Sequence, residues 1–345
     1  MSLEIWMSAM LIVALALIID RFVGEPPNAI HPLRWLGNMV YFFDRRIKDR
    51  SSRWTTMLGL LVQLLAYVLI LGTSLGMLAI VRHQDWAVDI SGTMVDVGEV
   101  TWIVLSALLF KFTFAIYSFR AHCDPIIQKL DDGDVDAAAE RLSMIVSRST
   151  KGMDSGHISS SCCETVSENF ADSIVSPGLY FGFLGLFGAI VMRCTNMMDA
   201  MWGYLNERYG RLGFFPAKSD DVLGFIPSRI SPFFILIGAR VLRFNTNGVI
   251  DAALREHGKT PSPNSGWPMT ATACALGISM EKRGVYVMGD GPLPTSDDVR
   301  RCCRLIEVSS LVFMILVAMP LFALIGIHLQ MAFENWIYDI LNVIL

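Results

Sequence analysis

Long apolar segments constrain the fold of this chain more than any other feature of its sequence. A helix that spans a membrane needs about 20 mostly apolar residues in succession. Residues 55–80 and 100–119 are long enough, although the second segment contains Lys111. Residues 5–19 and 308–329 form two further apolar runs. These runs predict an integral membrane protein.

The composition agrees with a helical membrane protein. Hydrophobic residues make up 53% of the chain and charged residues only 17%, whereas a soluble domain carries roughly 25% charged residues. A net charge of -4 gives no basis for binding nucleic acid. No stretch alternates apolar and polar residues over a useful strand length. We therefore predict an all-α, polytopic integral membrane protein with about 4–6 embedded helices and a helical active-site region at the cytoplasmic face.

The charges of the loops indicate the orientation in the membrane. Loop 20–54 carries seven Lys and Arg residues, whereas loop 81–99 carries one arginine and four acidic residues. Cytoplasmic loops are enriched in basic residues, so we place the first loop in the cytoplasm and the second outside. We expect segments 120–176, 194–228 and 256–300 to share the cytoplasmic face. The expected location is the cell membrane, with several passes.

The domain prediction is a single membrane-embedded domain over residues 1–345. Its parts are 1–119, with the first three transmembrane helices and the basic loop; 120–304, a helical catalytic region with embedded segments near 178–192 and 232–242; and 305–345, a C-terminal transmembrane helix with an amphipathic tail. Glycines recur through 178–192 at spacings that let helices pack closely. We expect a helical pair there that enters and returns, or a buried helix. Asp134 is expected to cap a helix whose apolar face includes Leu142.

The first polar motif is "DRFVGEPPNAIHPLRWLG", residues 20–37. Asp20 ends the first apolar run, and His31 and Arg34 could meet a phosphate or a carboxylate. The alternative is a rigid loop at the membrane interface, with Trp35 as an aromatic anchor.

A second motif, "ETVSENFAD", places Glu164, Glu168 and Asp172 at four-residue intervals, with Asn169 beside them. Like charges at this spacing repel each other on a helix, so three in succession suggest a bound cation. Proteins usually hold Mg²⁺ with carboxylates, water and substrate phosphates. A solvated helix face is the alternative.

Two more motifs are rich in carboxylates and amides. "NMMDAMWGY" places Asn196 and Asp199 on one helix face directly after an apolar segment, and "KSDDVLGFIPSRI" contains Asp220, Asp221 and Arg229. Buried polar groups at such positions need partners. The second of these motifs resembles a site for a metal and a phosphate.

The stretch "SPNSGWP", residues 262–268, is polar and stiff. Ser262 and Asn264 offer hydrogen bonds, Trp267 offers an apolar wall, and Pro268 can begin a helix whose N-terminus favours anions. The alternative is a turn between helices, since Pro and Gly interrupt helices for purely structural reasons. Common placement of these motifs on one membrane face predicts a shared polar pocket.

Several enzyme signatures are absent from the sequence. It contains no G-x-x-x-x-G-K-[ST] phosphate loop and no H-E-x-x-H metal motif. Its seven cysteines form no C-x-x-C pair, so we expect reduced thiols.

In chain order the motifs read D-x-x-x-G-E-P-P-x-x-x-H-P, S-R-x-T, E-x-x-x-E-N-x-x-D, N-x-x-D-x-M-x-G-Y, S-D-D-x-x-x-x-I-P-x-R and S-P-N-x-G-W-P. This series closely resembles the cobalamin-biosynthesis family CobD/CbiB, the adenosylcobinamide-phosphate synthases. The resemblance implies amide ligation of adenosylcobyric acid with aminopropanol phosphate, or with free aminopropanol, using ATP and Mg²⁺ and no tightly bound organic cofactor. It implies as partners the corrinoid, the amine donor, the bilayer and other late membrane enzymes of the pathway, and no nucleic acid.

The resemblance also gives the motifs their roles. Catalytic roles fall to Glu168, Asp172, Asp199, Asp221 and Arg148. Substrate or nucleotide contacts fall to Asp20, His31, Arg34, Asn169, Asn196, Arg229, Ser262, Asn264 and Trp267. Metal ligation falls to Glu168, Asp172, Asp220 and Asp221.

One position departs from the family pattern. Ser149 stands where the family usually has aspartate in S/G-R-D-T. Either that carboxylate is peripheral or a neighbour such as Asp154 replaces it.

Two other functions remain compatible with the motifs. One is a metal-dependent membrane transferase that acts on a diphosphate through its aspartate clusters. The other is a transporter, although no internal repeat of the transporter kind is visible.

Overall fold

The computed structural model of the protein describes most of the chain. The described residues are 3–25, 32–47, 52–84, 86–90 and 93–344. His31, one of the residues predicted to bind substrate, lies outside them. Helices dominate, so the all-α prediction is confirmed. The described strands form two short antiparallel hairpins, which the sequence reading missed.

The chain divides into two compact units. The first unit contains Met1–Phe114, Pro177–Val222 and Leu316–Leu345, and the second contains Ala115–Ser176 and Leu223–Ile315.

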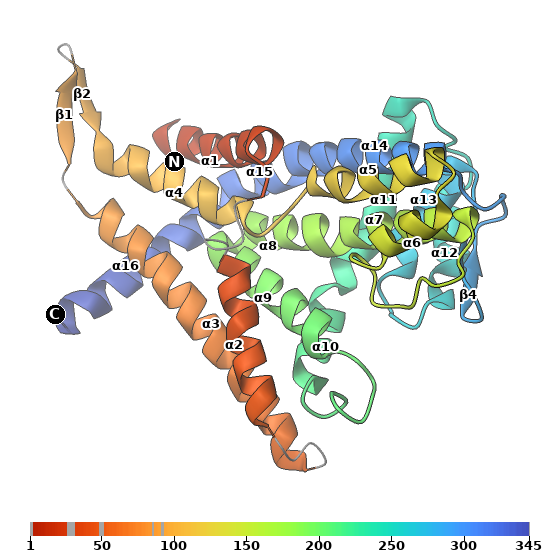
Figure 1. The fold of residues 1–345 in the computed structure, drawn as a ribbon. Coiled ribbons are helices and arrows are strands. Elements are labelled where there is room, and N and C mark those ends of the chain that lie inside the picture. The colour runs from red at the N-terminus through yellow and green to blue at the C-terminus, as the bar shows by residue number, and fades with distance from the viewer. Residues whose placement is uncertain (1–2, 26–31, 48–51, 85, 91–92, 345) are drawn as a thin grey trace. The chain divides into compact units, whose positions relative to one another are not determined.

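The first unit contains the long apolar helices of the N-terminal third. Its elements are α1 (Leu3–Phe22), α2 (Pro32–Arg46), α3 (Arg53–Arg82), β1 (Ala87–Ile90), β2 (Thr93–Asp96), α4 (Val97–Lys111), most of α8 (Ser176–Leu184), α9 (Leu186–Trp202), most of α10 (Phe214–Leu223), α15 (Met319–Leu321), the π-helical turn η4 (Phe322–Gly326) and α16 (Ile327–Ile344). Helix α1 packs against α4, and α3 packs against α4, α9 and α16 (Figure 1). These contacts bury one face of each helix.

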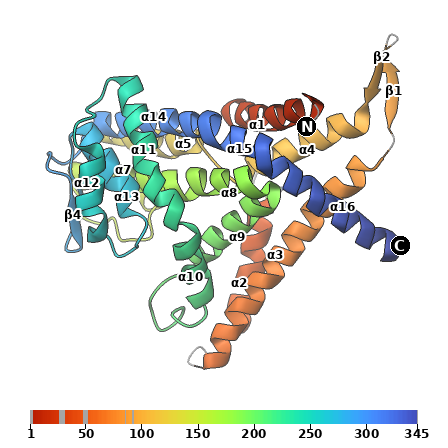
Figure 2. The same cartoon turned by 180° about the vertical axis from the view of Figure 1, so that it is seen from behind.

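The second unit is a helical bundle with a small hairpin. Its elements are α5 (Ser118–Asp131), α6 (Val135–Leu142), α7 (Ser155–Phe170), the π-helical turn η1 (Ala171–Val175), α11 (Phe225–Leu242), α12 (Val249–Glu256), the 3₁₀ turn η2 (His257–Lys259), α13 (Gly266–Leu276), β3 (Met280–Lys282), β4 (Tyr286–Met288), α14 (Ser296–Phe313) and the start of the π-helical turn η3 (Met314–Ala318). Helix α14 packs against α5, α7 and α11, and α13 packs against α7, α11 and α12 (Figure 2). As predicted, Asp134 caps α6, because its side chain accepts the Ala137 N–H, and Leu142 is buried.

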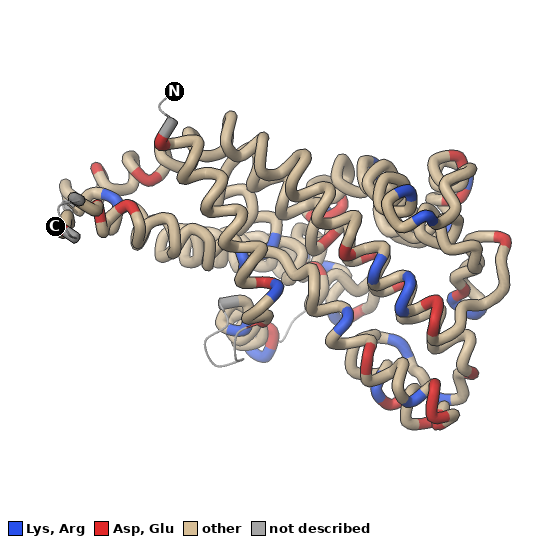
Figure 3. Tube along the Cα trace, turned by 90° about the horizontal axis from the view of Figure 1, so that it is seen from above, with Lys and Arg blue, Asp and Glu red and all other residues tan. Residues whose placement is uncertain are grey.

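Four described helical segments are long and apolar enough to cross a membrane: Glu4–Phe22, Arg53–Arg82, Phe225–Leu242 and Ser296–Val343. Three of them contain the predicted runs 5–19, 55–80 and 308–329. The fourth contains the predicted embedded run 232–242. Figure 3 shows long stretches of the trace without charged residues, as a helix surrounded by lipid requires.

The predicted span at 100–119 is not one continuous helix. Helix α4 ends at Lys111, and α5 begins only at Ser118. The Thr113 hydroxyl and backbone N–H both donate to the Phe110 carbonyl, at 2.7 and 2.9 Å, and so pair an acceptor at the end of the helix. The apolar composition of residues 100–119 gave no indication of this break between the two helices.

The glycine-rich segment 178–192 contains two helices. Helix α8 ends at Leu184, and α9 begins at Leu186. Between them Gly185 has a φ of 62°, a backbone conformation that glycine adopts without the steric cost of a side chain. The segment is therefore a helical pair joined at Gly185.

Two charged groups buried in the first unit, Lys111 and Glu334, have partners. Lys111 is 1% exposed, and its ammonium lies 3.1 Å from an Asp20 carboxylate oxygen and 2.8 Å from one of Glu25. Buried Glu334 on α16 accepts from Trp102 Nε1 at 2.9 Å and from Gln330 Nε2 at 3.0 Å. Pairing of this kind is what makes charged groups tolerable in an apolar interior.

The seven cysteines are all free thiols, as predicted. Six are buried, and Cys274 is half-buried. None of them is fully open to solvent.

Candidate functional site

The second unit contains a polar cavity of about 220 Å³. The segment after α6, helix α7 and the β3–β4 hairpin line it. Its lining residues are Ile145, Val146, Ser147, Arg148, Glu164, Thr165, Glu168, Asn169, Lys282 and Tyr286. Two cations, two carboxylates and an amide therefore surround one small space.

Helix α7 supplies the acidic wall of the cavity. Asp154 begins the helix, since its carboxylate accepts the His157 N–H at 3.0 Å, the usual arrangement of an N-cap. Hydrogen bonds from both the backbone N–H and the ring of His157 lower the pKa of the Asp154 carboxyl group below its ordinary value. Glu164, Glu168 and Asn169 then follow on the same side of the helix.

Glu164 is bound by side chains from three segments. Its carboxylate accepts from Arg148 at 3.0 Å, from Ser160 at 2.9 Å and from the Tyr286 hydroxyl at 2.8 Å. Burial and the neighbouring Glu164 raise the pKa of Tyr286. The phenol therefore stays protonated and donates a hydrogen bond to Glu164. Glu164 is 4% exposed and holds Arg148 and the hairpin in place.

Glu168 and Asn169 line the cavity, as the predicted site requires. The Asn169 amide donates to the Thr165 carbonyl at 2.9 Å and its oxygen accepts from Ser173 at 3.0 Å, which fixes its orientation. Asp172 lies in the π-helical turn η1 and is not among the lining residues. A π-helical turn contains an extra residue, so residues after this turn are shifted relative to α7, and the role of Asp172 stays a prediction.

The carboxylates of the cavity fit a Mg²⁺ ion that is held partly by water and substrate phosphates. Within the described residues, no three His, Cys, Asp or Glu side chains are grouped closely enough to hold a metal ion by themselves. Mg²⁺ is commonly held by one or two carboxylates together with water and substrate phosphates. Glu168 in the cavity can supply such a carboxylate. Metal binding by Glu168, Asp172, Asp220 and Asp221 remains a prediction.

The first unit brings two other motifs together on α9 and α10. The Asn196 amide donates to Asp220 at 3.4 Å and accepts from Arg193 at 3.1 Å. Lys218 lies 2.9 Å from Asp221. Burial, with a smaller effect of Asp221, raises the pKa of Asp199 to about 6. Asp199 can therefore exchange a proton close to neutral pH.

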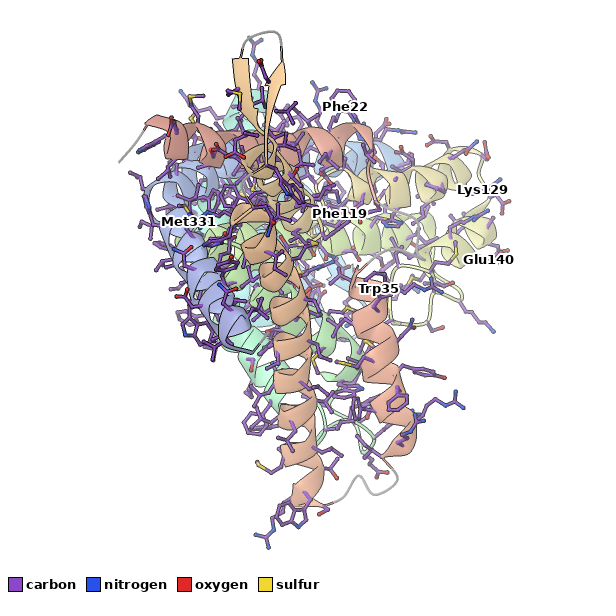
Figure 4. The ribbon with its side chains drawn as sticks, turned by 90° about the vertical axis from the view of Figure 1, so that its left-hand side faces the viewer. Phe22, Trp35, Phe119, Lys129, Glu140 and Met331 are labelled. Carbon is purple, nitrogen blue, oxygen red and sulfur yellow. The ribbon has the colours of Figure 1, made fainter. Side chains whose placement is uncertain are left out.

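Asp20 and Arg34 differ in their surroundings. Asp20 is 2% exposed and paired with Lys111 in the interior of the first unit, which favours a structural role. Arg34 lies exposed in the first turn of α2. Its neighbour Trp35 is 58% exposed and projects from α2 (Figure 4), as an aromatic anchor at a membrane interface would.

The "SPNSGWP" loop braces the helices of the second unit. The Ser262 hydroxyl accepts the backbone N–H of Asn264 at 3.2 Å. Asn264 is 4% exposed, and its side-chain oxygen accepts from Ser228 and Arg229 of α11, each at 3.3 Å. These contacts favour the structural alternative for Ser262 and Asn264.

The same loop begins α13 close to η2. Trp267 stacks on His257 with ring centres 4.0 Å apart, and Arg229 lies 5.2 Å from the Trp267 ring. A Cβ on Gly266 would lie 2.0 Å from the His257 carbonyl oxygen, so only glycine permits this approach. Pro268 falls in the first turn of α13, where the sequence predicted that it could begin a helix.

Comparison with known proteins identifies the family. The family described as "CobD/Cbib protein" matches residues 13–306. The chain belongs to the CobD/CbiB family. A "Probable cobalamin biosynthesis protein CobD" of Methanococcus aeolicus is 35% identical over 283 residues, covering 82% of this chain and 88% of that protein. A "Cobalamin biosynthesis protein CobD" of Dehalococcoides mccartyi is 32% identical over 296 residues, covering 86% and 92%. No solved structure matches the chain.

The CobD/CbiB motif that departs from the family pattern lies at the edge of the cavity. Ser149 is exposed and is not a lining residue, whereas Arg148 beside it is. Asp154 caps α7 and pairs with Arg283 at 2.6 Å and with His157 at 2.8 Å. Asp154 is therefore engaged with α7 and the hairpin turn rather than facing the cavity.

Two cavity residues of this CobD/CbiB member were missed in the sequence. Lys282 and Tyr286 lie on the β3–β4 hairpin, more than a hundred residues after α7. The only local signal was Gly284 before the short strand-prone run 285–287, which is a weak indication of a turn.

Proposed function

We propose that this protein is an adenosylcobinamide-phosphate synthase of the cytoplasmic face of the cell membrane. It would join adenosylcobyric acid to aminopropanol phosphate, or to free aminopropanol, in an amide ligation that consumes ATP and requires Mg²⁺. Membership of a family of cobalamin biosynthesis proteins supports the pathway. The observation that carries the reaction is the cavity in which Arg148, Glu168 and Asn169 meet.

In this proposal the cavity residues position phosphoryl groups and balance their charge. Arg148, held by Ser161 at 2.6 Å and by Glu164 at 3.0 Å, presents a guanidinium fork that suits phosphate oxygens. Glu168 would hold Mg²⁺, which supplies charge neutralisation at the ATP phosphates. Asn169 has a fixed amide with which it can orient a substrate.

The chemistry proceeds in two steps. A corrinoid carboxylate oxygen attacks the γ-phosphorus of ATP, the bond to the β-phosphate oxygen breaks, and ADP leaves. The amine nitrogen of the donor then attacks the acyl carbon, and phosphate leaves with the pair of electrons from the C–O bond. The amine proton passes to a carboxylate or to His31, the two alternatives for the base. Positioning and electrostatic stabilisation supply most of the rate in phosphoryl transfer.

The carboxylates of the first unit have a place in the same proposal. Asp220 and Asp221 would hold metal, and Asp199, whose pKa is about 6, would act in proton transfer. A catalytic acid or base works best with a pKa near the working pH.

The decisive experiment uses the purified full-length protein in lipid nanodiscs. Adenosylcobyric acid, aminopropanol phosphate, ATP and Mg²⁺ are supplied together and one at a time, with mass detection of the amide and an assay for ADP. We expect both products only from the complete mixture. Glu168→Gln and Asp221→Asn should lose about a hundredfold or more in rate, and Asp136→Asn, at an exposed position of α6, should lose nothing.

Other outcomes identify the rival functions. Amide formation without ATP consumption would contradict the ligase. Transfer from a diphosphate substrate would indicate the transferase. Substrate uptake into proteoliposomes without covalent change would indicate the transporter.

A further inference from the structure

Lys282 is a charged residue of the cavity to which the proposed function gives no role. It lines the space with Arg148, Glu164 and Glu168. No ion pair joins Lys282 to any residue that the structure describes. A cation that faces a small polar cavity without an acidic partner is suited to bind an anion from solution.

The hairpin holds Lys282 in a defined position. Lys282 and Tyr286 are paired across β3 and β4, so their side chains project from the same face of the hairpin. The Tyr286 hydroxyl donates to Glu164 at 2.8 Å, which turns that face toward α7.

A second contact fixes the hairpin to α7. The Ser160 hydroxyl accepts the Glu281 N–H at 2.8 Å and donates to Glu164 at 2.9 Å. Because Glu281 directly precedes Lys282, the backbone that carries the lysine is tied to α7. Fixed side chains bind a ligand with a smaller loss of conformational entropy.

Arg148 offers the second half of an anion site. Its terminal nitrogen Nη2 is held by Ser161 and Glu164. Its Nε is buried and has no hydrogen-bond partner among the described residues. Buried donors are normally paired, so an acceptor oxygen from a ligand is expected at this nitrogen.

The charges and the volume limit the kind of ligand. Glu164 already balances Arg148, and Lys282 adds a positive charge that forms no ion pair with Glu168, the carboxylate proposed to hold Mg²⁺. A cavity of about 220 Å³ is smaller than the roughly 300–1,000 Å³ of pockets that enclose drug-sized molecules. It therefore fits one charged group of a substrate and not a corrin ring.

We propose that Lys282 and Arg148 form a binding site for a phosphate group carried by a small molecule. The guanidinium provides directional hydrogen bonds, and the ammonium provides a point charge, which are the two usual ways in which proteins bind phosphate. The phosphate belongs either to the nucleotide or to the amine donor. Only the identity of these two molecules rests on the proposed function.

The test measures equilibrium binding without turnover. Wild type, Lys282→Met and Lys282→Arg are compared in nanodiscs, with Lys129→Met as the matched control. Lys129 lies near the end of α5 (Figure 4) and pairs with Asp132 at 3.5 Å. The probes are ATP with Mg²⁺, aminopropanol phosphate, free aminopropanol and inorganic phosphate, and melting curves verify that each variant is folded.

We expect Lys282→Met to weaken binding of at least one phosphate-bearing probe by about ten- to a hundredfold, the effect of one charge-assisted hydrogen bond. Lys282→Arg should restore most of this affinity, because it restores the charge. Free aminopropanol should bind equally to all variants, and Lys129→Met should resemble wild type. A loss for ATP alone assigns the site to the nucleotide, and a loss for aminopropanol phosphate alone assigns it to the donor.

Unchanged affinity of a folded Lys282→Met for every phosphate-bearing probe would overturn the proposal. A loss of equal size in Lys129→Met would overturn it as well, since the effect would then reflect net charge only. Failure of the ligase activity is a separate result: wild type would form no amide, while Lys282→Met would still bind phosphate more weakly.

Discussion

Lys111→Met should lower the free energy of unfolding by about 3–5 kcal/mol, the usual cost of breaking a buried ion pair by removing one partner. The ammonium of Lys111 lies 3.1 Å from Asp20, and both side chains are 1% exposed. Without the lysine, Asp20 keeps a buried charge with its main cation gone. Glu25 is 36% exposed, so water screens most of its share of the interaction.

A double-mutant cycle isolates this effect. Lys111→Met and Asp20→Asn are each measured alone and then together, by denaturant titration of the protein in detergent micelles. The double variant should be more stable than Lys111→Met, since it removes the uncompensated charge, and the coupling between the two positions should exceed about 1 kcal/mol. Lys129→Met, with its exposed pair, should change stability by less than about 1 kcal/mol.

Two results would refute this reasoning. One is a Lys111→Met protein that unfolds at the denaturant concentration of wild type. The other is a double variant whose loss equals the sum of the two single losses. Either would mean that water reaches Asp20 and that the pair contributes little.

Three further predictions concern the second unit. Gly266→Ala should cost about 1–3 kcal/mol, because its Cβ would lie 2.0 Å from the His257 carbonyl oxygen, and a melting curve like that of wild type would contradict this. Asp154→Ala should cost about 1 kcal/mol through loss of the α7 cap. Because the pKa of Asp154 is lowered in the folded protein, its contribution is complete above its ordinary pKa of about 4 and is lost as the pH falls through the lowered value, which melting curves of wild type and Asp154→Asn against pH would reveal. Asn264→Ala should lower the melting temperature, because it removes an acceptor that Arg229 and Ser228 share and leaves them the Phe225 carbonyl; unchanged stability with weakened binding of ATP or aminopropanol phosphate would instead support the predicted substrate contact.

The sequence predicted the features that depend on neighbouring residues in the chain. Runs 55–80 and 308–329 fall within candidate spans, because length and apolar composition are sufficient to identify them. The cap at Asp134 follows from a short side chain before an apolar helix face. Arg148 and Glu168 were identified from motifs and do line one cavity.

The features that the sequence missed depend on distant contacts. The π-helical turn Ala171–Val175, which contains Asp172, has no sequence signature of its own. The sequence alone offers no reason for a charged residue, Lys111, within an apolar run. Its partner Asp20 lies some ninety residues earlier in the chain, so only the structure reveals the ion pair. Lys282 reaches the cavity through hairpin pairing and carries no motif.

The burial of the native cysteines makes the β3–β4 hairpin a convenient place for a chemical label. Six of the seven thiols are buried and Cys274 is half-buried, whereas Val285 at the hairpin turn is 51% exposed. A maleimide probe should therefore react first with the thiol of a Val285→Cys protein. The turn adjoins the strand that carries Lys282 without entering the cavity, so the emission of a fluorophore there would follow occupancy of the site. The same thiol, treated with an impermeant reagent in intact and opened cells, would report on which side of the bilayer the hairpin lies.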